Sequence, residues 1–276
     1  MNRPLSLAAL TVLELSPPDM VSCAADAGYP HVSLRLIPAT DNEPTWDAIG
    51  DTPMVRELAH RLADRGMRVL DIEIFRLRRD TVVKGYLAAL DTGARLGAQH
   101  VLVAGDDPDE ARLTEHFAAL CALGAPLGLT FDLEPMPWTD VVELRQASRI
   151  AAASGQSNAG VLIDPIHFDR VGNVPRDIAM LPPRQLHYAQ LCDAPAERPR
   201  DMPTLLHQAR AERLMPGDGG LDLAGILRAL PSSLPLSLEV PMQDLARTVP
   251  AVERARRIRA RTEALLAKLE LPAAVG

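Results

Sequence analysis

Short apolar runs alternate with longer amphipathic stretches along this chain. Runs dense in β-branched and aliphatic residues predict eight strands, at Leu5–Leu10, His31–Leu36, Arg68–Phe75, His100–Ala104, Leu127–Glu134, Ala159–Asp164, Leu186–Leu191 and Pro235–Val240. Between them, hydrophobic residues at helical spacing predict helices over Pro53–Gly66, Val82–Leu96, Glu110–Leu123, Thr139–Ala153, Asp222–Leu230 and Leu245–Leu269. The pattern therefore alternates strand and helix.

Alternation of this kind favours an α/β fold with a parallel sheet. Eight strand-helix units predict one closed (β/α)8 TIM barrel that spans residues 1–276 as a single domain. An open doubly wound sheet is the structural alternative. In a barrel, the functional residues lie at the C-terminal ends of the strands.

The composition narrows the class of protein. A formal charge of −7 argues against a face that grips phosphate backbones, so we expect no nucleic-acid partner. No apolar stretch approaches the roughly 20 residues that cross a bilayer, so we expect no membrane span. The three cysteines lack CxxC spacing, which argues against a disulfide framework and indicates a reducing cytoplasm. A homo-oligomer is left open.

Four of the predicted strands end in side chains that carry oxygen. FDLE ends at Glu134, GVLID at Asp164, LHYAQ at Gln190 and LPLSLE at Glu239. If these strands are parallel neighbours, their ends converge, and three carboxylates that close would repel one another. A divalent cation would remove that repulsion, so the pattern predicts a metal site.

Two further candidates follow these strands. His167, in DPIHF, comes directly after the sixth strand and is expected to face the same mouth. Asp193, in QLCDAP, either orients a ligand or the following loop, or forms a turn beside Pro195. The irregular segment Pro195–Pro203 is interpreted as a lid.

Three arginines are candidates for substrate binding. Arg210 and Arg213 follow the predicted lid, and either could hold a carboxylate or phosphate group of a substrate, while one of them is expected only to pair with Glu197, Glu212 or Asp218. Arg35, at the end of the second strand, is a weaker pocket candidate, because a salt bridge between strands explains it equally well.

The motifs LEP, DPIHF, QLCDAP, RLMPGDGGLDL and SLEV resemble those of the xylose isomerase-like TIM barrels, the sugar phosphate isomerase/epimerase superfamily. The resemblance covers nearly the whole chain. It implies that one divalent metal is held by Glu134, Asp164, Gln190 and Glu239. Many sugar isomerases and epimerases of this family carry histidine where this chain has Gln190, and an all-oxygen set favours Mg²⁺ or Mn²⁺ over Zn²⁺.

QLCDAP followed by RLMPGDGGLDL is also similar to the bacterial 3-dehydroshikimate dehydratases of this superfamily, which use glutamine at the same point. Some of these dehydratases carry a histidine two residues beyond the glutamate of the fifth strand. This chain has Met136 there, so that role would pass to another residue or be absent.

The resemblance implies an enzyme that removes a proton next to a carbonyl group through a metal-stabilised enolate. We favour an isomerase or epimerase that acts on a sugar or related polyhydroxy carbonyl compound. Such an enzyme would use Glu134 and Glu239 to move the proton, and His167 would bind a hydroxyl group of the substrate. As a dehydratase-type lyase, it would use His167 or a glutamate as base and Arg210 or Arg213 on a substrate carboxylate.

Two alternatives belong to other classes. An endonuclease of the related fold would need a histidine-rich cluster of three zinc ions and a basic surface, which a −7 chain with seven scattered histidines does not predict. A non-catalytic barrel that binds a metabolite or acts only as a subunit would hold no metal.

Overall fold

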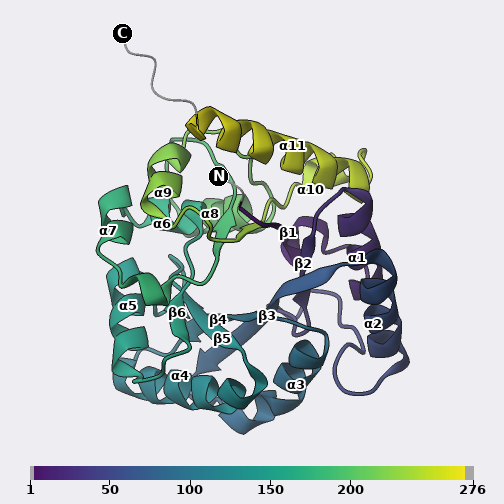
Figure 1. The fold of residues 1–276 in the computed structure, drawn as a ribbon. Coiled ribbons are helices and arrows are strands. Elements are labelled where there is room, and N and C mark those ends of the chain that lie inside the picture. Colours follow the sequence, from purple (N-terminus) through teal and green to yellow (C-terminus); the bar gives the residue numbers. More distant parts are fainter. Residues whose placement is uncertain (1–2, 271–276) are drawn as a thin grey trace.

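Eight parallel strands form the centre of the structure, a computed structural model that describes residues 3–270 (Figure 1). All eight predicted strands are present. They are β1 (Leu5–Leu7), β2 (His31–Arg35), β3 (Arg68–Arg78), β4 (His100–Asp106), β5 (Thr130–Glu134), β6 (Ala159–Val161), β7 (Ala189–Leu191) and β8 (Leu236–Leu238).

The helices surround the strands as an outer ring (Figure 1). They are α1 (Pro17–Asp26), α2 (Pro53–Arg65), α3 (Leu87–Arg95), α4 (Glu110–Gly124), α5 (Leu144–Ala153), α6 (Pro165–Arg170), α7 (Pro175–Ala179), α8 (Met202–Arg210), α9 (Leu223–Ala229), α10 (Gln243–Ala246) and α11 (Ala251–Glu270). Their apolar faces and the outward-facing strand residues form the main hydrophobic core.

The strand order shows a barrel. Neighbours in the sheet run β6-β5-β4-β3-β2-β1-β8-β7, so the first and last strands of the chain lie side by side. The ring continues from β7 to the end of β6 through a hydrogen bond from Gln190 N to Ile163 O of 2.9 Å. The fold is therefore the predicted (β/α)8 barrel. The doubly wound alternative is wrong, because the strands follow one another around a ring without reversing order.

Several predicted boundaries were wrong for local reasons. The fifth strand begins at Thr130, because Ala125–Leu127 form a 3₁₀ turn that ends at Gly128, whose φ of 76° is left-handed. The sixth strand ends at Val161, and Asp164 instead caps α6. The predicted Leu245–Leu269 helix is divided into α10 and α11, which begins directly after Pro250.

The remaining differences concern helices that the pattern did not indicate. The predictions omitted α1, α6 and α7, and α8 begins inside the segment interpreted as a lid. The predicted domain of residues 1–276 includes residues 1–2 and 271–276, which lie outside the described part of the chain.

The interior of the barrel holds a polar layer below the strand ends. Ser33 Oγ lies 3.1 Å from Ser6 Oγ and 3.0 Å from Ser237 Oγ, and it donates to Asp71 Oδ1 at 2.5 Å. Residues two apart on a strand face the same way. Arg35, Glu73 and Glu239 therefore face the barrel interior one layer above Ser33, Asp71 and Ser237. The polar residues thus extend inward from the mouth of the barrel.

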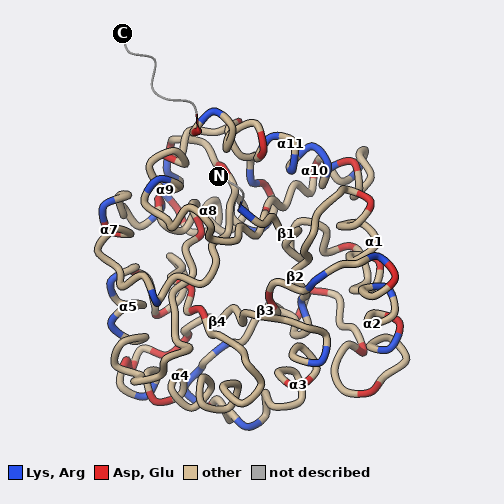
Figure 2. Tube along the Cα trace, in the orientation of Figure 1, with Lys and Arg blue, Asp and Glu red and all other residues tan. Residues whose placement is uncertain are grey.

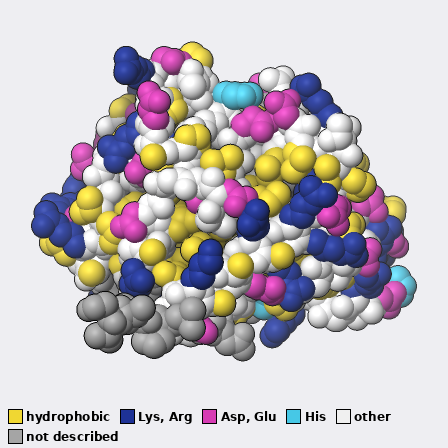
Figure 3. Space-filling model, turned by 90° about the horizontal axis from the view of Figure 1, so that it is seen from above, with side chains coloured by type: hydrophobic (Ala, Val, Ile, Leu, Met, Phe, Trp, Pro, Cys, Tyr) yellow, Lys and Arg dark blue, Asp and Glu magenta, His cyan; other side chains and the backbone are white. Residues whose placement is uncertain are grey.

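Acidic and basic residues are intermixed over the outer helices. Figure 2 shows both signs along α2 and α11, and Figure 3 shows them interspersed on one face. The arginines of α11 contact acidic neighbours: Arg254 pairs with Glu14, Arg257 with Glu253, Arg259 with Glu263 and Arg261 with Asp218. Among the described helices, none combines the length and apolar character required to cross a membrane.

Candidate metal and active site

Three functional side chains meet at the C-terminal mouth of the barrel. Glu134 ends β5, Asp164 caps α6, and His167 lies in the first turn of that helix. One potential ligand atom from each lies within 4.8 Å of the other two, and all three residues are buried. His167 Nε2 is 3.7 Å from both Glu134 Oε1 and Asp164 Oδ2. In the described chain this is the one such group of His, Cys, Asp and Glu, and it contains a single histidine.

Arg213 connects this group to Glu239. Its Nη1 donates to Asp164 Oδ2 at 2.6 Å, and its Nη2 lies 2.8 Å from Glu239 Oε2. The guanidinium is buried and also donates through Nε to Ala209 O at 2.7 Å. Arg213 therefore pairs with carboxylates, as expected for one of the two arginines, but with Asp164 and Glu239 instead of surface acids.

Gln190 is the uncharged member of the predicted oxygen set. It lies at the centre of β7, and its Oε1 is buried without a hydrogen-bond partner among residues 3–270. Glu134 Oε1 is likewise buried and without a hydrogen bond in that part of the chain. Buried oxygens are normally paired, and oxygen-only sets suit Mg²⁺ and Mn²⁺. These donor types fit a divalent cation, and Arg213 balances part of the negative charge. Of the predicted ligands, only Glu134 and Asp164 belong to the compact group with His167; Glu239 lies outside that group and pairs with Arg213.

Burial and mutual repulsion perturb the carboxyl groups at the mouth of the barrel. Burial, together with the charges of Asp164 and Glu239, raises the pKa of Glu134 well above its usual value. Burial also raises the pKa of Glu239 to about 7, although Arg213 opposes the shift. Of these three carboxyl groups, Asp164 alone has a lowered pKa, because its contacts with Arg213 and the nearby His167 outweigh its burial.

His167 is neutral near pH 7 in this environment. Burial lowers the pKa of its imidazole to about 4, against the attraction of Asp164. Its ring meets the Trp138 ring edge-on, with centroids 4.8 Å apart. A neutral imidazole at this position can act as a base.

A pocket of about 700 Å³ opens above these residues. Glu134, His167, Arg213 and Glu239 lie on its wall, and the loops after β1, β2, β5 and β8 supply much of the rest. Its size lies within the range of small-molecule sites. Part of the predicted set therefore lines one cavity at the end of the barrel where the fold places chemistry, while Asp164, Gln190 and Asp193 are not on its wall.

Arg210 lies on the wall of this pocket. Its guanidinium carbon is 5.0 Å from the centre of the Trp138 ring, a cation–π arrangement. No described carboxylate forms an ion pair with it. Burial, with repulsion from Arg76 and Arg35, lowers the pKa of Arg210. The pocket thus contains an arginine without an acidic partner.

Arg35 also faces the pocket but is already paired. It donates to Glu73 Oε2 at 2.6 Å and to Glu43 Oε1 at 2.9 Å. The salt bridge between strands that the sequence allowed is therefore present. Through Glu43, which accepts from Ala39 N at 2.8 Å, it also fixes the loop after β2.

Asp193 does not line the pocket. Its carboxylate accepts backbone hydrogen bonds from Ala194, Gly217, Gly219 and Leu221 at 2.8–3.1 Å. These contacts organise the Gly-Asp-Gly-Gly turn. Of the two expected roles of Asp193, the structure therefore supports turn formation and not the orientation of a ligand.

Trp138 is a residue of the site that was not predicted from the sequence. It contacts both His167 and Arg210 and therefore determines how the two side chains are placed. The available signal was weak: one of only two tryptophans in the chain follows the end of the fifth strand by four residues.

Comparisons with known proteins agree with this fold. The model of a family described as xylose isomerase-like TIM barrel matches residues 21–264. A 3-dehydroshikimate dehydratase of Pseudomonas aeruginosa is 32% identical over 201 residues, which cover 67% of this chain and 31% of that protein. The chain thus spans about a third of the length of this curated relative.

Solved structures share the fold at lower identity. A protein named IOLI, with a bound zinc atom, has a TM-score of 0.79 at 18% identity, covering 96% of this chain and 99% of that one. A D-allulose 3-epimerase from Methylomonas sp. has a TM-score of 0.68 at 15% identity, covering 96% of each chain. A fusion of a xylose isomerase-like barrel with 4-hydroxyphenylpyruvate dioxygenase has a TM-score of 0.75 at 23% identity, covering 100% of this chain and 46% of that one.

Proposed function

Since the chain belongs to the xylose isomerase-like TIM barrel family, we propose that it is a divalent-metal-dependent lyase that dehydrates a hydroxylated keto acid. The substrate we propose is 3-dehydroshikimate or a close analogue. Mg²⁺ or Mn²⁺ would be held by Glu134, Asp164, Gln190 and Glu239.

The unpaired guanidinium of Arg210 carries the choice of reaction. A buried or half-buried arginine normally pairs with an anion, and a substrate carboxylate supplies one in bidentate geometry. A neutral sugar offers no such group. The 32% identical dehydratase supports the same choice. This reverses the order expected from sequence, where an isomerase or epimerase was preferred to a lyase.

The residues of the site have separate tasks in this reaction. A bound divalent cation would act as a Lewis acid on the substrate carbonyl oxygen and make the neighbouring hydrogen more acidic. His167 would take that proton at Nε2, since its low pKa leaves the imidazole neutral. The electrons of the C–H bond form the new double bond as the β-hydroxyl group departs, so proton and hydroxide leave as water.

Arg213 would stabilise the charge of the site throughout the reaction. Its contacts with Asp164 and Glu239 hold both carboxylates in place. Trp138 would orient the two groups that meet the substrate, because it packs against His167 and supports Arg210.

An isomerase or epimerase is the second candidate. Glu134 and Glu239 are two carboxylates with raised pKa values on the wall of one pocket. Such a pair can remove a proton from one side of a carbon and return it on the other.

The test is to incubate the purified chain with 3-dehydroshikimate and Mg²⁺ or Mn²⁺ and to follow the formation of protocatechuate. Ketoses in deuterated water, followed by NMR for exchange of the α-proton, test the second candidate. His167→Gln should keep metal binding and lose turnover. Loss of metal binding in that variant would make His167 a ligand and contradict its role as the base.

A further inference from the structure

A second, much smaller cavity lies beside the site, and His167 lines both it and the large pocket. It leaves about 10 Å³ for the centre of a water-sized sphere, so a water molecule fits in it. Asp164, His167 and Asn173 supply its polar wall. The rest is apolar: Pro135, Leu144, Leu162, Ile163, Phe168 and Val171.

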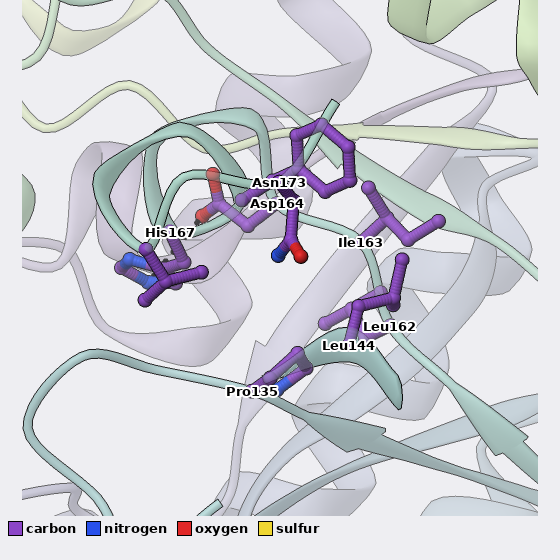
Figure 4. Close-up of a pocket in the computed structure, with 9 residues that line it drawn as sticks. Pro135, Leu144, Leu162, Ile163, Asp164, His167 and Asn173 are labelled. Atoms are coloured by element: carbon purple, nitrogen blue, oxygen red, sulfur yellow. Dashed lines mark ion pairs between the residues drawn. The ribbon is translucent and has the colours of Figure 1, made fainter. Parts of the chain in front are cut away.

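Two polar atoms at this cavity have no hydrogen-bond partner among residues 3–270. They are Nδ2 of Asn173 and Nδ1 of His167, and both are buried. Figure 4 shows the Asn173 amide pointing into the space between His167 and the leucines at positions 144 and 162. An unpaired buried polar atom costs about 1–3 kcal/mol, so two at one water-sized space indicate a bound water molecule.

The backbone places Asn173 here for a local reason. At the end of α6, Gly172 adopts a φ of 83°, its N–H donates to Asp169 O at 2.8 Å, and Asn173 N–H donates to Phe168 O at 3.2 Å. This paired pattern is a Schellman motif. It turns the chain back so that the Asn173 side chain reaches the same helix that carries His167.

We propose that one water molecule fills this cavity and that Asn173, through it, positions His167 with the hydrogen on Nδ1 and the lone pair on Nε2. The amide nitrogen of Asn173 can only donate, so the water accepts from it. The Asp164 carboxylate can only accept, so the water directs a hydrogen toward it. The second lone pair of the water is then available to the Nδ1–H of His167.

The other ring nitrogen agrees with this assignment. Nε2 lies 3.7 Å from Glu134 Oε1 and Asp164 Oδ2, which is too long for a hydrogen bond. Among the described residues neither ring nitrogen of His167 forms a hydrogen bond, so a water molecule at Nδ1 would decide the tautomer. The consequence for catalysis, a lone pair facing the substrate, rests on the proposed function. The tautomer itself does not.

The experiment is ¹⁵N NMR of metal-free protein labelled at histidine, at a pH where His167 is neutral and without substrate. The chain has seven histidines, and the signals of His167 are identified by their loss in His167→Gln. We expect a protonated Nδ1 and an unprotonated Nε2 in the wild type. An Nε2–H tautomer in the wild type would overturn the proposal.

Two variants separate the water from the amide. Asn173→Leu removes the donor, and Val171→Leu fills the cavity while Asn173 stays in place. Both should shift His167 toward the Nε2–H tautomer, and a wild-type ratio in both would overturn the proposal. If the dehydratase activity is found, each should lower kcat by about 10–100-fold, as for groups that orient catalytic residues, with KM unchanged. If no activity is found, the NMR result still decides the inference.

Discussion

Replacing Arg213 by methionine is the most informative perturbation of the site. The substitution keeps an unbranched side chain of similar length but removes the positive charge between Asp164 and Glu239. The side chains of Arg213 and Asp164 are 2% and 0% exposed, and that of Glu239 is 6% exposed. Little water therefore reaches the carboxylates that remain. Removing one partner of a buried ion pair costs about 3–5 kcal/mol, so we expect a loss of about that size in the free energy of unfolding.

The assay is urea unfolding with a chelator present, followed by circular dichroism. Arg254→Met is the matched control. Its guanidinium is equally buried, but the Glu14 side chain with which it pairs is 48% exposed, so water can solvate the remaining carboxylate. We expect about 1 kcal/mol of loss there, in the range of exposed pairs.

The same experiment with metal tests the charge balance. At 100 times its dissociation constant, a metal ion should stabilise the wild type by about 2.7 kcal/mol. At the same metal concentration the gain in Arg213→Met should be larger, because the metal then supplies positive charge to carboxylates that have lost their partner. A loss below about 1 kcal/mol in chelator, or equal gains from metal in both proteins, would refute the reasoning.

Four further outcomes follow from the structure: three concern the site, and one concerns His100 at the start of β4. Glu239→Gln should abolish turnover and leave the circular dichroism spectrum unchanged; normal activity would remove Glu239 from the mechanism. Gln190→His should increase thermal stabilisation by Zn²⁺ relative to Mg²⁺, because imidazole suits zinc; an unchanged ratio would argue against Gln190 as a ligand. Arg210→Gln should raise KM at least tenfold for a keto acid, whereas Arg247→Gln, at the exposed rim of the pocket, should not; equal effects would contradict the carboxylate contact. Burial lowers the pKa of His100 to about 4, so its contribution to stability is present above pH 6.5 and is lost as the pH falls toward 4. In urea unfolding, the free energy of unfolding of His100→Gln should therefore fall by about 2 kcal/mol less than that of the wild type between pH 7.5 and 5. Equal losses in the two proteins would contradict the shift.

The fold was predictable because its signal repeats. Each strand is a short apolar run, and each of the main helices has one apolar face, so the count of eight did not depend on any single boundary. The errors lie where geometry at one residue decides the result. The turn at Gly128 delays the start of the fifth strand, and Pro250 separates α10 from α11, where the hydrophobic pattern alone predicts continuous elements.

The site was predictable only in part. Glu134 and Asp164 were expected together because parallel strands end at one edge, and the structure places them with His167. The pairing of Arg213 with Asp164 and Glu239 joins residues 49 and 26 positions apart in sequence, and no local pattern encodes it. Trp138 and Asn173 were missed for the same reason, since each acquires its contacts from a loop conformation.

The central claim is that the oxygens of Glu134, Asp164, Gln190 and Glu239 hold one divalent cation. Titration of metal-free protein with Mn²⁺, with free ion measured by electron paramagnetic resonance, tests it most directly. We expect one bound ion per chain in the wild type and strongly weakened binding in Glu134→Gln and Gln190→Leu. Absence of Mn²⁺ binding at millimolar concentration, or unchanged binding in both variants, would contradict it.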